Sequence, residues 1–367
     1  MALPGLLRFE EAFFDRIWGG ERMRTVLGKA TPADRTIGEA WLIADHAAHE
    51  SVVADGPRAG ATLRQLLEED ATALLGAKAA LTVHGRFPLL LKVLDSAQPL
   101  SVQVHPDDAR AAELGEPDVG KTEMWHVLDA AADGELICGL DPSVTAEAFG
   151  AAIPDGTVER MMTRFAAPPG TSAFVPAGTV HAIGGGMLLA EIQQNSALTY
   201  RIYDWGRVDD SGKPRTLHVE KALKVTAFGS AHAGPVHPLA CETDGLHRTV
   251  HAACRYFAAE RLRVDGPAAR DTRSASFHIL LGVTGRVRVG AGDGEADLGP
   301  GEAVLVPGGE SRFTLEGAGE VLDYYVPDLA QDVAAPLAAA GHGRDAIVRL
   351  GGSPDTSDLR GAVVGTA

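Results

Sequence analysis

The sequence predicts a mainly β protein made of two related barrels of short strands, with helical inserts between the strands. Two observations lead to this fold class. Short segments alternate between apolar and polar residues and are separated by turns rich in glycine and proline, which is typical of strands. One strand–turn–strand motif also occurs twice along the chain, which indicates two copies of one unit.

The first third of the chain mixes strands with helices. Residues 5–56 have the composition of short strands and turns. Apolar residues recur at helical spacing after Thr62, a candidate N-cap. A second helical segment begins with acidic residues and ends near Gly115, as helices commonly do. We therefore expect helices over 62–76 and 106–115 and strands over 87–96 and 121–130.

The rest of the chain is expected to be richer in strands. Residues 143–165 predict two helical pieces, and residues 217–229 predict a short helix. Between them, residues 170–207 predict strands separated by glycine turns. Beyond about residue 250, short strands alternate with Gly-rich turns.

The repeated motif reads PGTSAFVPAGTVHAI from Pro169 and PGEAVLVPGGESRFT from Pro300. The offset is constant, since 300 − 169 = 131 and 307 − 176 = 131. Turn signals of this kind are common, so coincidence is one interpretation; two copies of a barrel unit are the other. The alignment places His181 opposite Arg312. It therefore predicts one barrel that keeps a metal-type histidine and one that is structural.

Composition excludes several classes of function. The chain of 367 residues is 45% hydrophobic and 22% charged, as in ordinary globular proteins. A formal net charge of −16 argues against nucleic acid and anionic membranes as partners. We find no secretory signal and no apolar run of the ~18 residues that a spanning helix needs. The three cysteines are widely spaced, which argues against a disulfide framework and predicts a cytoplasmic protein.

One alternating strand combines polar groups on a single face. In SVQVH, residues 101–105, Val102 and Val104 share one face, and Ser101, Gln103 and His105 share the other. The polar face is either a solvated surface or the floor of a site.

The segment KTEMWHVL decides between two further candidate ligands. Its alternation places Glu123 on the same face as Lys121, and His126 on the opposite face. We choose Glu123 as the inward residue because a cation beside a metal suits an anionic substrate. Each polar residue taken alone is more often an ordinary buried residue than a ligand. The candidate ligands together are Gln103, His105, Glu123 and His181.

Five motifs carry a family resemblance, in this order: PLSVQVHPDD, GKTEMWHVL, VPAGTVHAIGGG, EIQQNSALTYRIYDWGR and LHVEKAL. Over about residues 5–330 the chain resembles the class I mannose-6-phosphate isomerases, in their short bacterial form. These are zinc-dependent members of the cupin superfamily with tandem β-barrels. The expected domains are a catalytic cupin domain over 1–245, a second, metal-free cupin domain over 246–330, and an Ala/Gly-rich C-terminal tail over 331–367.

The resemblance implies a role for each matching residue. It implies one Zn²⁺ per chain, held by Gln103, His105, Glu123 and His181. Arg201 matches the catalytic arginine, and Ser101 and Lys121 match residues near the substrate phosphate. Lys92 and Glu191 match active-site positions. At Ala197 the family pattern has an acid, so one loop contact departs from it. The implied partner is a small sugar phosphate, and the chain is expected to be a monomer or a weak homodimer.

The expected reaction interconverts mannose 6-phosphate and fructose 6-phosphate through an enediol. Charge develops on two sugar oxygens, which a metal and Arg201 would stabilise. Lys121, Glu191 and a metal-bound hydroxide remain candidates for the general base. Arg201 could instead form a surface salt bridge, and Lys92 could be a lysine whose stem alone is buried.

Three other functions stay open at this point. The chain could isomerise another aldose, or bind sugar without catalysis. A dioxygenase on the same fold is the third, although that class favours iron held by two or three histidines. The presence of the whole ligand set and of Arg201 favours the isomerase.

Overall fold

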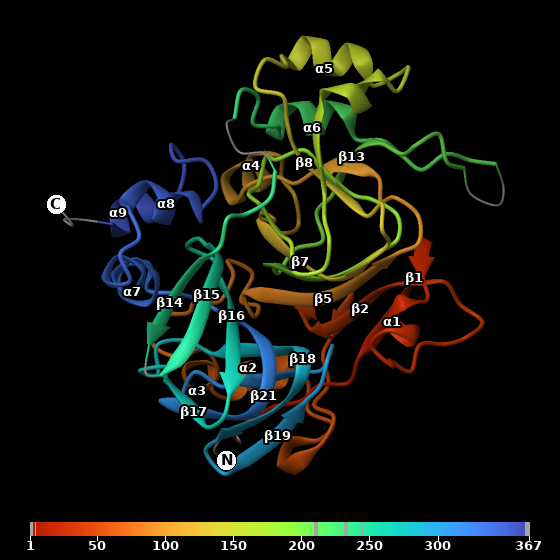
Figure 1. The fold of residues 1–367 in the computed structure, drawn as a ribbon. Helices are drawn as coiled ribbons and strands as arrows, with labels where there is room; N and C mark the ends of the chain where they lie inside the picture. Colours follow the sequence, from red (N-terminus) through yellow and green to blue (C-terminus); the bar gives the residue numbers. More distant parts are fainter. Residues whose placement is uncertain (1–2, 4, 209–211, 231–233, 244, 364–367) are drawn as a thin grey trace. The chain divides into compact units, whose positions relative to one another are not determined.

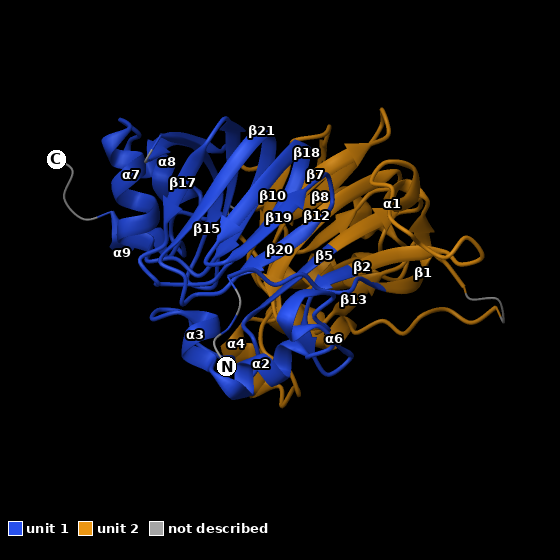
Figure 2. Cartoon of the chain, turned by 90° about the horizontal axis from the view of Figure 1, so that it is seen from below, with its two compact units in different colours: residues 1–12, 41–92, 237–367 blue, residues 13–40, 93–236 orange. Residues whose placement is uncertain are grey.

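The computed structural model is mainly β, built of antiparallel sheets with a smaller share of helix, which confirms the predicted fold class (Figure 1). The structure describes residues 3, 5–208, 212–230, 234–243 and 245–363. The chain divides into two compact units, each made of separate segments (Figure 2). Unit 1 comprises residues 1–12, 41–92 and 237–367, and unit 2 comprises residues 13–40 and 93–236.

The strands of unit 2 form two antiparallel sheets. Their bounds are β1 Ala12–Gly20, β2 Ile37–Ile43, β5 Leu89–Ser96, β6 Val102–Val104, β7 Glu123–Ala130, β8 Glu135–Leu140, β9 Met162–Ala166, β10 Ser172–Val175, β11 His181–Ile183, β12 Met187–Gln194 and β13 Tyr200–Tyr203. One sheet has the order β1-β2-β5-β12-β7-β10, and the other β13-β6-β11-β8-β9. The division between the units falls within β1, β2 and β5 and again between residues 236 and 237.

Two apolar clusters stabilise unit 2. One contains Trp125 of β7 with residues of β8, β10, β11 and β12, and so joins the two sheets. The other packs Val102 and Val104 of β6 against Phe149 and Ala222, which belong to helices over the outer face of the second sheet. The helices of this unit are α1 Arg22–Thr25, α4 Asp108–Glu113, α5 Ala146–Ala152, η2 Thr157–Met161 and α6 Val219–Val225.

Unit 1 is built on one larger sheet. Its strands are β3 Asp45–His46, β4 His49–Glu50, β14 Leu239–Thr243, β15 Leu246–Ala253, β16 Ala258–Asp265, β17 Ala268–Asp271, β18 His278–Ala291, β19 Gly294–Leu298, β20 Ala303–Val306 and β21 Arg312–Tyr325. The main order is β14-β15-β16-β21-β18-β19, with β17 paired to β21 and β20 to β18; β3 and β4 pair separately. The helices are η1 Gly56–Arg58, α2 Leu63–Glu69, α3 Ala71–Leu75, η3 Leu329–Ala334, α7 Ala335–Ala339, α8 Arg344–Arg349 and α9 Leu359–Ala362.

The repeat is present in the strands themselves. β10 and β20 have the same length, and their first residues, Ser172 and Ala303, are separated by 303 − 172 = 131 positions. The next strands, β11 and β21, begin at His181 and Arg312, again 312 − 181 = 131 apart. Gly170 and Gly301, which precede β10 and β20, both have positive φ angles, of 89° and 79°. The two motifs therefore share the turn before the first strand and begin both strands at the same offset.

The first predicted helix begins at the N-cap that the sequence indicated. The Thr62 side chain accepts a hydrogen bond from Gln65 N, and the Gln65 side chain accepts one from Thr62 N, which begins α2. The helical segment then divides, because Asp70 ends α2 and caps α3 by accepting from Ala73 N.

Two segments differ from the prediction. Residues 162–165, expected as the end of a helix, lie in the edge strand β9 and pair with β8. β18 and β21 have 14 residues each, although short strands were expected; their pairing shifts register between Gly282 and Thr284. The Ala/Gly-rich tail, for which no secondary structure was predicted, contains helices with fully buried Leu337 and Ile347.

The compact units do not follow the linear division into 1–245, 246–330 and 331–367. Residues 41–92 belong to unit 1 because long-range contacts hold them there. Phe277 N donates to Leu75 O at 3.1 Å, and the rings of Phe87 and Phe277 lie 4.4 Å apart. Such pairs join distant parts of the chain and leave no local pattern in the sequence.

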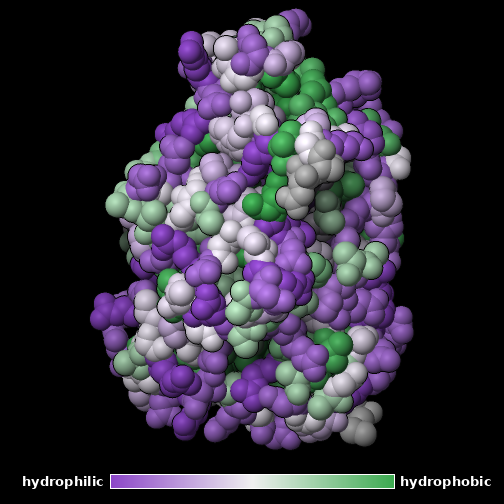
Figure 3. Space-filling view, turned by 90° about the vertical axis from the view of Figure 1, so that its right-hand side faces the viewer, coloured by the Kyte–Doolittle hydropathy of each residue, from purple (hydrophilic) through white to green (hydrophobic). Residues whose placement is uncertain are grey.

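The surface and the thiols agree with the composition. Hydrophilic residues cover most of the face drawn in Figure 3, with hydrophobic residues in smaller areas between them. None of the helices in the described part of the chain is long and apolar enough to cross a membrane. Cys138, Cys241 and Cys254 are buried free thiols, as their spacing predicted.

Candidate metal centre

Three predicted ligands meet inside unit 2. The ligand atoms of His105, Glu123 and His181 all lie within 4.8 Å of one another. Nε2 of His181 is 3.3 Å from Oε1 of Glu123, and Nε2 of His105 is 3.6 Å from Oε2 of the same carboxylate. All three side chains are at most 1% exposed. This is the only such cluster of three among the described residues.

The strands explain why these residues meet. His181 on β11 lies directly opposite Gln103 on β6, and opposite residues of an antiparallel pair share a face. Val102 and Val104 point the other way, into the apolar cluster under α5 and α6. The polar face of the 101–105 segment is therefore the floor of the cluster, the second interpretation that the alternation left open.

β7 supplies the third residue from the other sheet. Glu123 joins the cluster, whereas the Nδ1 atom of His126 lies 2.9 Å from Ser172 Oγ. The alternation of KTEMWHVL predicted this separation of the two side chains. Trp125, on the same face as Glu123, packs edge-on against His181 with ring centroids 5.3 Å apart.

Main-chain carbonyls fix the tautomers of both histidines. His105 Nδ1 lies 2.7 Å from Leu198 O, and His181 Nδ1 lies 2.8 Å from Thr179 O. A carbonyl oxygen can only accept, so Nδ1 carries the proton in each ring. Nε2 then presents its lone pair toward Glu123, which is the usual arrangement of a metal-binding histidine.

Burial and charge set the protonation states of the cluster. Burial, followed by the charge of Lys121, lowers the pKa of His105 to about 3, and burial also lowers the pKa of His181. Burial alone would raise the pKa of Glu123, but Lys121 and His105 hold it well below its usual range. The cluster is thus two neutral imidazoles and one carboxylate, the forms that bind metals.

The arrangement fits a metal ion. Oε1 of Glu123 and Nε2 of His181 are buried acceptors without a hydrogen-bond partner among the described residues, and they face each other at 3.3 Å. Buried acceptors left unsatisfied are costly. A cation between the two atoms would satisfy both. Gln103, partly buried and opposite His181, can offer its side-chain oxygen to the same ion.

Lys121 contacts two of these residues. Its Nζ lies 2.5 Å from Glu123 Oε2 and 3.2 Å from His105 Nε2. Burial lowers the pKa of Lys121, but the charges of Glu123 and Glu191 outweigh it and raise the pKa. In this arrangement Lys121 is a buried ammonium beside the cluster.

Glu191 lies nearby on β12. It is 3% exposed, and its Oε2 accepts a hydrogen bond from Trp125 Nε1 at 3.1 Å. Glu191 and Trp125 are direct partners across β12 and β7, so they share the face that carries Glu123.

Arg201 and Ser101 lie together at the other end of the polar face. Arg201 on β13 is the direct partner of Gln103, and its Nε donates to Ser101 Oγ at 3.2 Å. Nη1 donates to Thr216 O at 2.9 Å. These two contacts fix the Arg201 guanidinium within unit 2. Among the described residues, no acidic side chain forms a surface salt bridge with it.

Lys92 belongs to unit 1. Its side chain is buried, and Nζ lies 5.0 Å from the centre of the Trp41 ring, a cation–π distance.

Sequence reasoning missed the segment that supports the site. Gln193 Nε2 donates to Gln194 O at 2.9 Å and to Ser196 O at 2.5 Å, and this segment carries the Leu198 carbonyl that fixes His105. The amide-rich run QQNS was the available signal. At Ala197, where an acid was expected, the backbone N donates to Asp118 Oδ2 at 2.8 Å, so another loop supplies a carboxylate.

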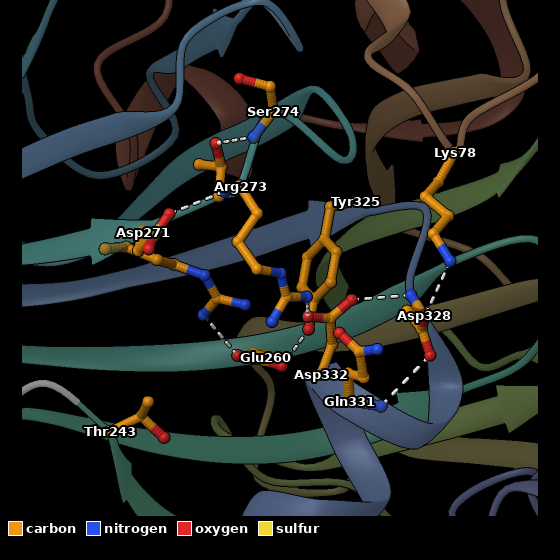
Figure 4. Close-up of polar contacts among 12 residues, drawn as sticks. Lys78, Thr243, Glu260, Asp271, Arg273, Ser274, Tyr325, Asp328, Gln331 and Asp332 are labelled. Carbon is orange, nitrogen blue, oxygen red and sulfur yellow. Dashed lines mark hydrogen bonds and ion pairs between the residues drawn. The ribbon is translucent and has the colours of Figure 1, made fainter.

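The second barrel has a different interior. Arg312, which corresponds to His181, is exposed. Inside unit 1, Glu260 accepts from Arg248 at 2.5 and 2.8 Å and from Arg270 at 2.8 Å. It also accepts from Tyr325 Oη at 2.5 Å; Glu260 and Tyr325 are labelled in Figure 4. The buried charges pair with one another here, as expected of a structural barrel.

Comparison with known proteins agrees with these observations. Residues 6–142 match the family model described as phosphomannose isomerase type I, catalytic domain. Residues 247–326 match the one described as mannose-6-phosphate isomerase, cupin domain.

Similar proteins cover most of the chain. Mannose-6-phosphate isomerase ManA of Bacillus subtilis is 37% identical over 318 residues, 86% of this chain and 97% of that protein. Mannose-6-phosphate isomerase of Streptococcus mutans is 33% identical over 323 residues, 88% and 98% of the two chains. The crystal structure of mannose 6-phosphate isomerase from Bacillus subtilis aligns with a TM-score of 0.78 at 32% identity, over 88% of this chain and 99% of that chain. The chain therefore belongs to the mannose-6-phosphate isomerase family, and it is an enzyme with a cupin fold.

Proposed function

We propose that the chain is a zinc-dependent aldose–ketose isomerase that interconverts mannose 6-phosphate and fructose 6-phosphate in the cytoplasm. The observation that carries the proposal is the buried trio of His105, Glu123 and His181, with unsatisfied acceptor atoms facing one another. The proposed substrate is taken from the similar proteins, which are named mannose-6-phosphate isomerases.

Two imidazoles, one carboxylate and the amide of Gln103 form a set of nitrogen and oxygen donors that suits Zn²⁺ with a position left for substrate. When bound, zinc would act as a Lewis acid toward the sugar oxygens at C1 and C2. The carbonyl contacts of His105 and His181 would hold both rings in the required orientation.

The isomerisation moves a proton between C1 and C2 through an enediol. We propose that Glu191 accepts this proton, since it is a buried acidic side chain on the face that carries Glu123. Lys121, an ammonium beside Glu123, would act as a proton donor. Lys121 would in addition contact the substrate, because its ammonium lies beside the cluster. Lys92 and Ser101 are the other proposed substrate contacts.

Arg201 is proposed to stabilise the negative charge of the enediolate. Its guanidinium is fixed by Ser101 Oγ and Thr216 O before substrate binds. Preorganised charges of this kind lower barriers because they need no reorganisation during the reaction.

A coupled assay with mannose 6-phosphate and fructose 6-phosphate, run on samples of known metal content, tests the proposal. We expect both directions of the reaction, abolished by chelation and restored by zinc. A zinc-loaded sample that converts neither sugar phosphate would contradict it. Activity on another aldose alone would assign the chain to a different substrate on the same fold.

A further inference from the structure

The motif LHVEKAL, residues 217–223, supplies none of the proposed metal ligands or substrate contacts. It contains His218 and the first residues of α6. Ala222 of this helix is buried in the apolar cluster that also contains Tyr200 of β13. The helix therefore packs against the strand that carries Arg201.

Arg201 lies on a strand with an open edge. β13 is the outermost strand of its sheet, so only one side of its backbone pairs with another strand, β6. The pairing shifts register between Arg201 and Tyr203, directly after the arginine. A bulge at a sheet edge disrupts the ladder of hydrogen bonds, so other contacts must fix the direction of the Arg201 side chain.

His218 bonds to both main-chain polar groups of Arg201. His218 N donates to Arg201 O at 2.7 Å, and Arg201 N donates to His218 Nδ1 at 3.2 Å. Two residues earlier, the carbonyl oxygen of Thr216 accepts from Arg201 Nη1 at 2.9 Å. The segment before α6 therefore holds the main chain and the guanidinium of Arg201 together.

The contact fixes the tautomer of His218. A main-chain N–H can only donate, so Nδ1 must accept, and the proton of the neutral ring lies on Nε2. This is the tautomer opposite to that of the histidines in the candidate metal centre. Burial, and then the charges of Arg201 and Lys221, lower the pKa of His218, which favours the neutral ring. The charge of Glu116 opposes this shift of the pKa.

A second contact holds α6 to β13. Glu116 Oε1 accepts from Lys221 Nζ on α6 at 2.5 Å and from Tyr200 Oη on β13 at 2.8 Å. Lys221, and then Tyr200, lower the pKa of Glu116, so this carboxylate is ionised. It joins the same two elements that His218 joins, and so keeps the imidazole beside the backbone of β13.

We propose that His218 is a positioning residue for Arg201, because its Nδ1 fixes the main chain of the arginine at the open edge of β13. This rests on the proposed function for the role of Arg201 itself. The guanidinium is then preorganised by a helix that contributes no candidate ligand. Such positioning matters to the rate, because misplacing a catalytic group by about 1 Å can cost as much as 10²-fold.

The test compares His218→Phe with His218→Asn in the full chain, with zinc measured on each batch. His218→Phe removes the acceptor, and kcat for mannose 6-phosphate should fall roughly 10- to 100-fold with KM changed far less. Asparagine places Oδ1 where Nδ1 stands, so His218→Asn should recover most of the kcat. A normal kcat in His218→Phe, or an asparagine variant no better than the phenylalanine variant, would overturn the inference.

A double-mutant cycle separates positioning from a general structural role. In the Arg201→Ala background, His218→Phe should lower kcat by less than about twofold, because the group that it positions is gone. The full loss in both backgrounds would show that His218 acts independently of Arg201, against the inference.

Lys224→Ala is the control on the same helix, because Lys224 is exposed and pairs with Glu220. It should leave kcat unchanged in both backgrounds. A fall as large as that of His218→Phe would mean that any change on α6 impairs the enzyme, and the specific role of His218 would be lost.

If His218→Phe fails to fold, His218→Gln takes its place, since a glutamine acceptor reaches the position of Nε2 and not that of Nδ1. His218→Asn should then keep the higher kcat, and equal values would overturn the inference.

If the wild-type enzyme converts no sugar phosphate, the proposed function fails. ¹⁵N NMR of histidine-labelled protein then still decides whether Nδ1 accepts, with His218→Asn used to assign the signals. We expect His218 to carry its proton on Nε2, and a proton on Nδ1 would overturn the inference.

Discussion

Arg201 is the residue for which geometry makes the sharpest kinetic prediction. Its charge would act on the enediolate more than on bound sugar, so Arg201→Ala should lower kcat more than it raises KM. A loss of roughly 10²–10³ in kcat is typical for one preorganised group. Zinc should remain bound, because no proposed ligand is touched. Steady-state kinetics with metal analysis on one batch test this; near-normal kcat with intact zinc would make the arginine structural.

Lys121 has two proposed roles that one comparison separates. As a substrate contact it should affect the phosphorylated sugar more, so Lys121→Ala should raise KM for mannose 6-phosphate far more than for free mannose. If Lys121 acts as a proton donor, or through its contact with Glu123 at 2.5 Å, Lys121→Ala should lower kcat for both sugars. Equal effects on the two sugars would remove the substrate-contact role and leave the chemical one.

At the scale of secondary-structure elements, the alternation of side chains along strands predicted the candidate metal centre better than any single residue did. A period of two placed Glu123 inward and His126 outward on β7, and it separated Val102 from Gln103 on β6. The repeat predicted β10 and β20 because both follow the same proline–glycine turn. β9 was missed because its alternating residues follow directly on a helical turn, η2.

The buried ion pairs of unit 1, among Arg248, Glu260 and Arg270, left no local pattern in the sequence. Arg248, Glu260 and Arg270 come from three different strands, and only pairing across the sheet brings them together.

Glu260 should be a major determinant of the stability of unit 1. Burial would raise its pKa, but Arg248 and Arg270 hold it below the usual range. Glu260→Gln leaves two buried arginines without their counter-ion and should lower the free energy of unfolding by about 3–5 kcal/mol. Urea denaturation at pH 7 measures this, with the exposed Glu113→Gln as control. A loss no greater than that of the control would contradict the assignment.

The pH dependence of stability follows from the lowered pKa of Glu260. A carboxylate whose folded pKa is depressed stabilises the fold above its unfolded pKa, about 4.3 for glutamate. The stabilisation is lost as the pH falls toward the folded pKa. The wild type should therefore lose stability below about pH 4.3, and Glu260→Gln should lose less over the same range.

At the scale of the whole molecule, the net charge and the two barrel motifs are the features to explain. A net charge of −16 would repel the proposed anionic substrate, so its capture would depend on a local cluster of cations. The two copies of the barrel motif have diverged: one keeps His181, and the other has the exposed Arg312 and a self-paired ionic interior. Each compact unit, by contrast, is made of segments that are separated in the sequence, and no local sequence pattern predicted this division.

The central claim is that one zinc ion binds each chain at His105, Glu123 and His181. Elemental analysis of the purified wild type and of three alanine variants, paired with activity, tests it most directly. We expect one zinc per wild-type chain, loss of zinc and activity in His105→Ala and His181→Ala, and near-normal zinc in His126→Ala. Two metals per chain, iron alone in an active sample, or loss of zinc in His126→Ala would contradict the claim.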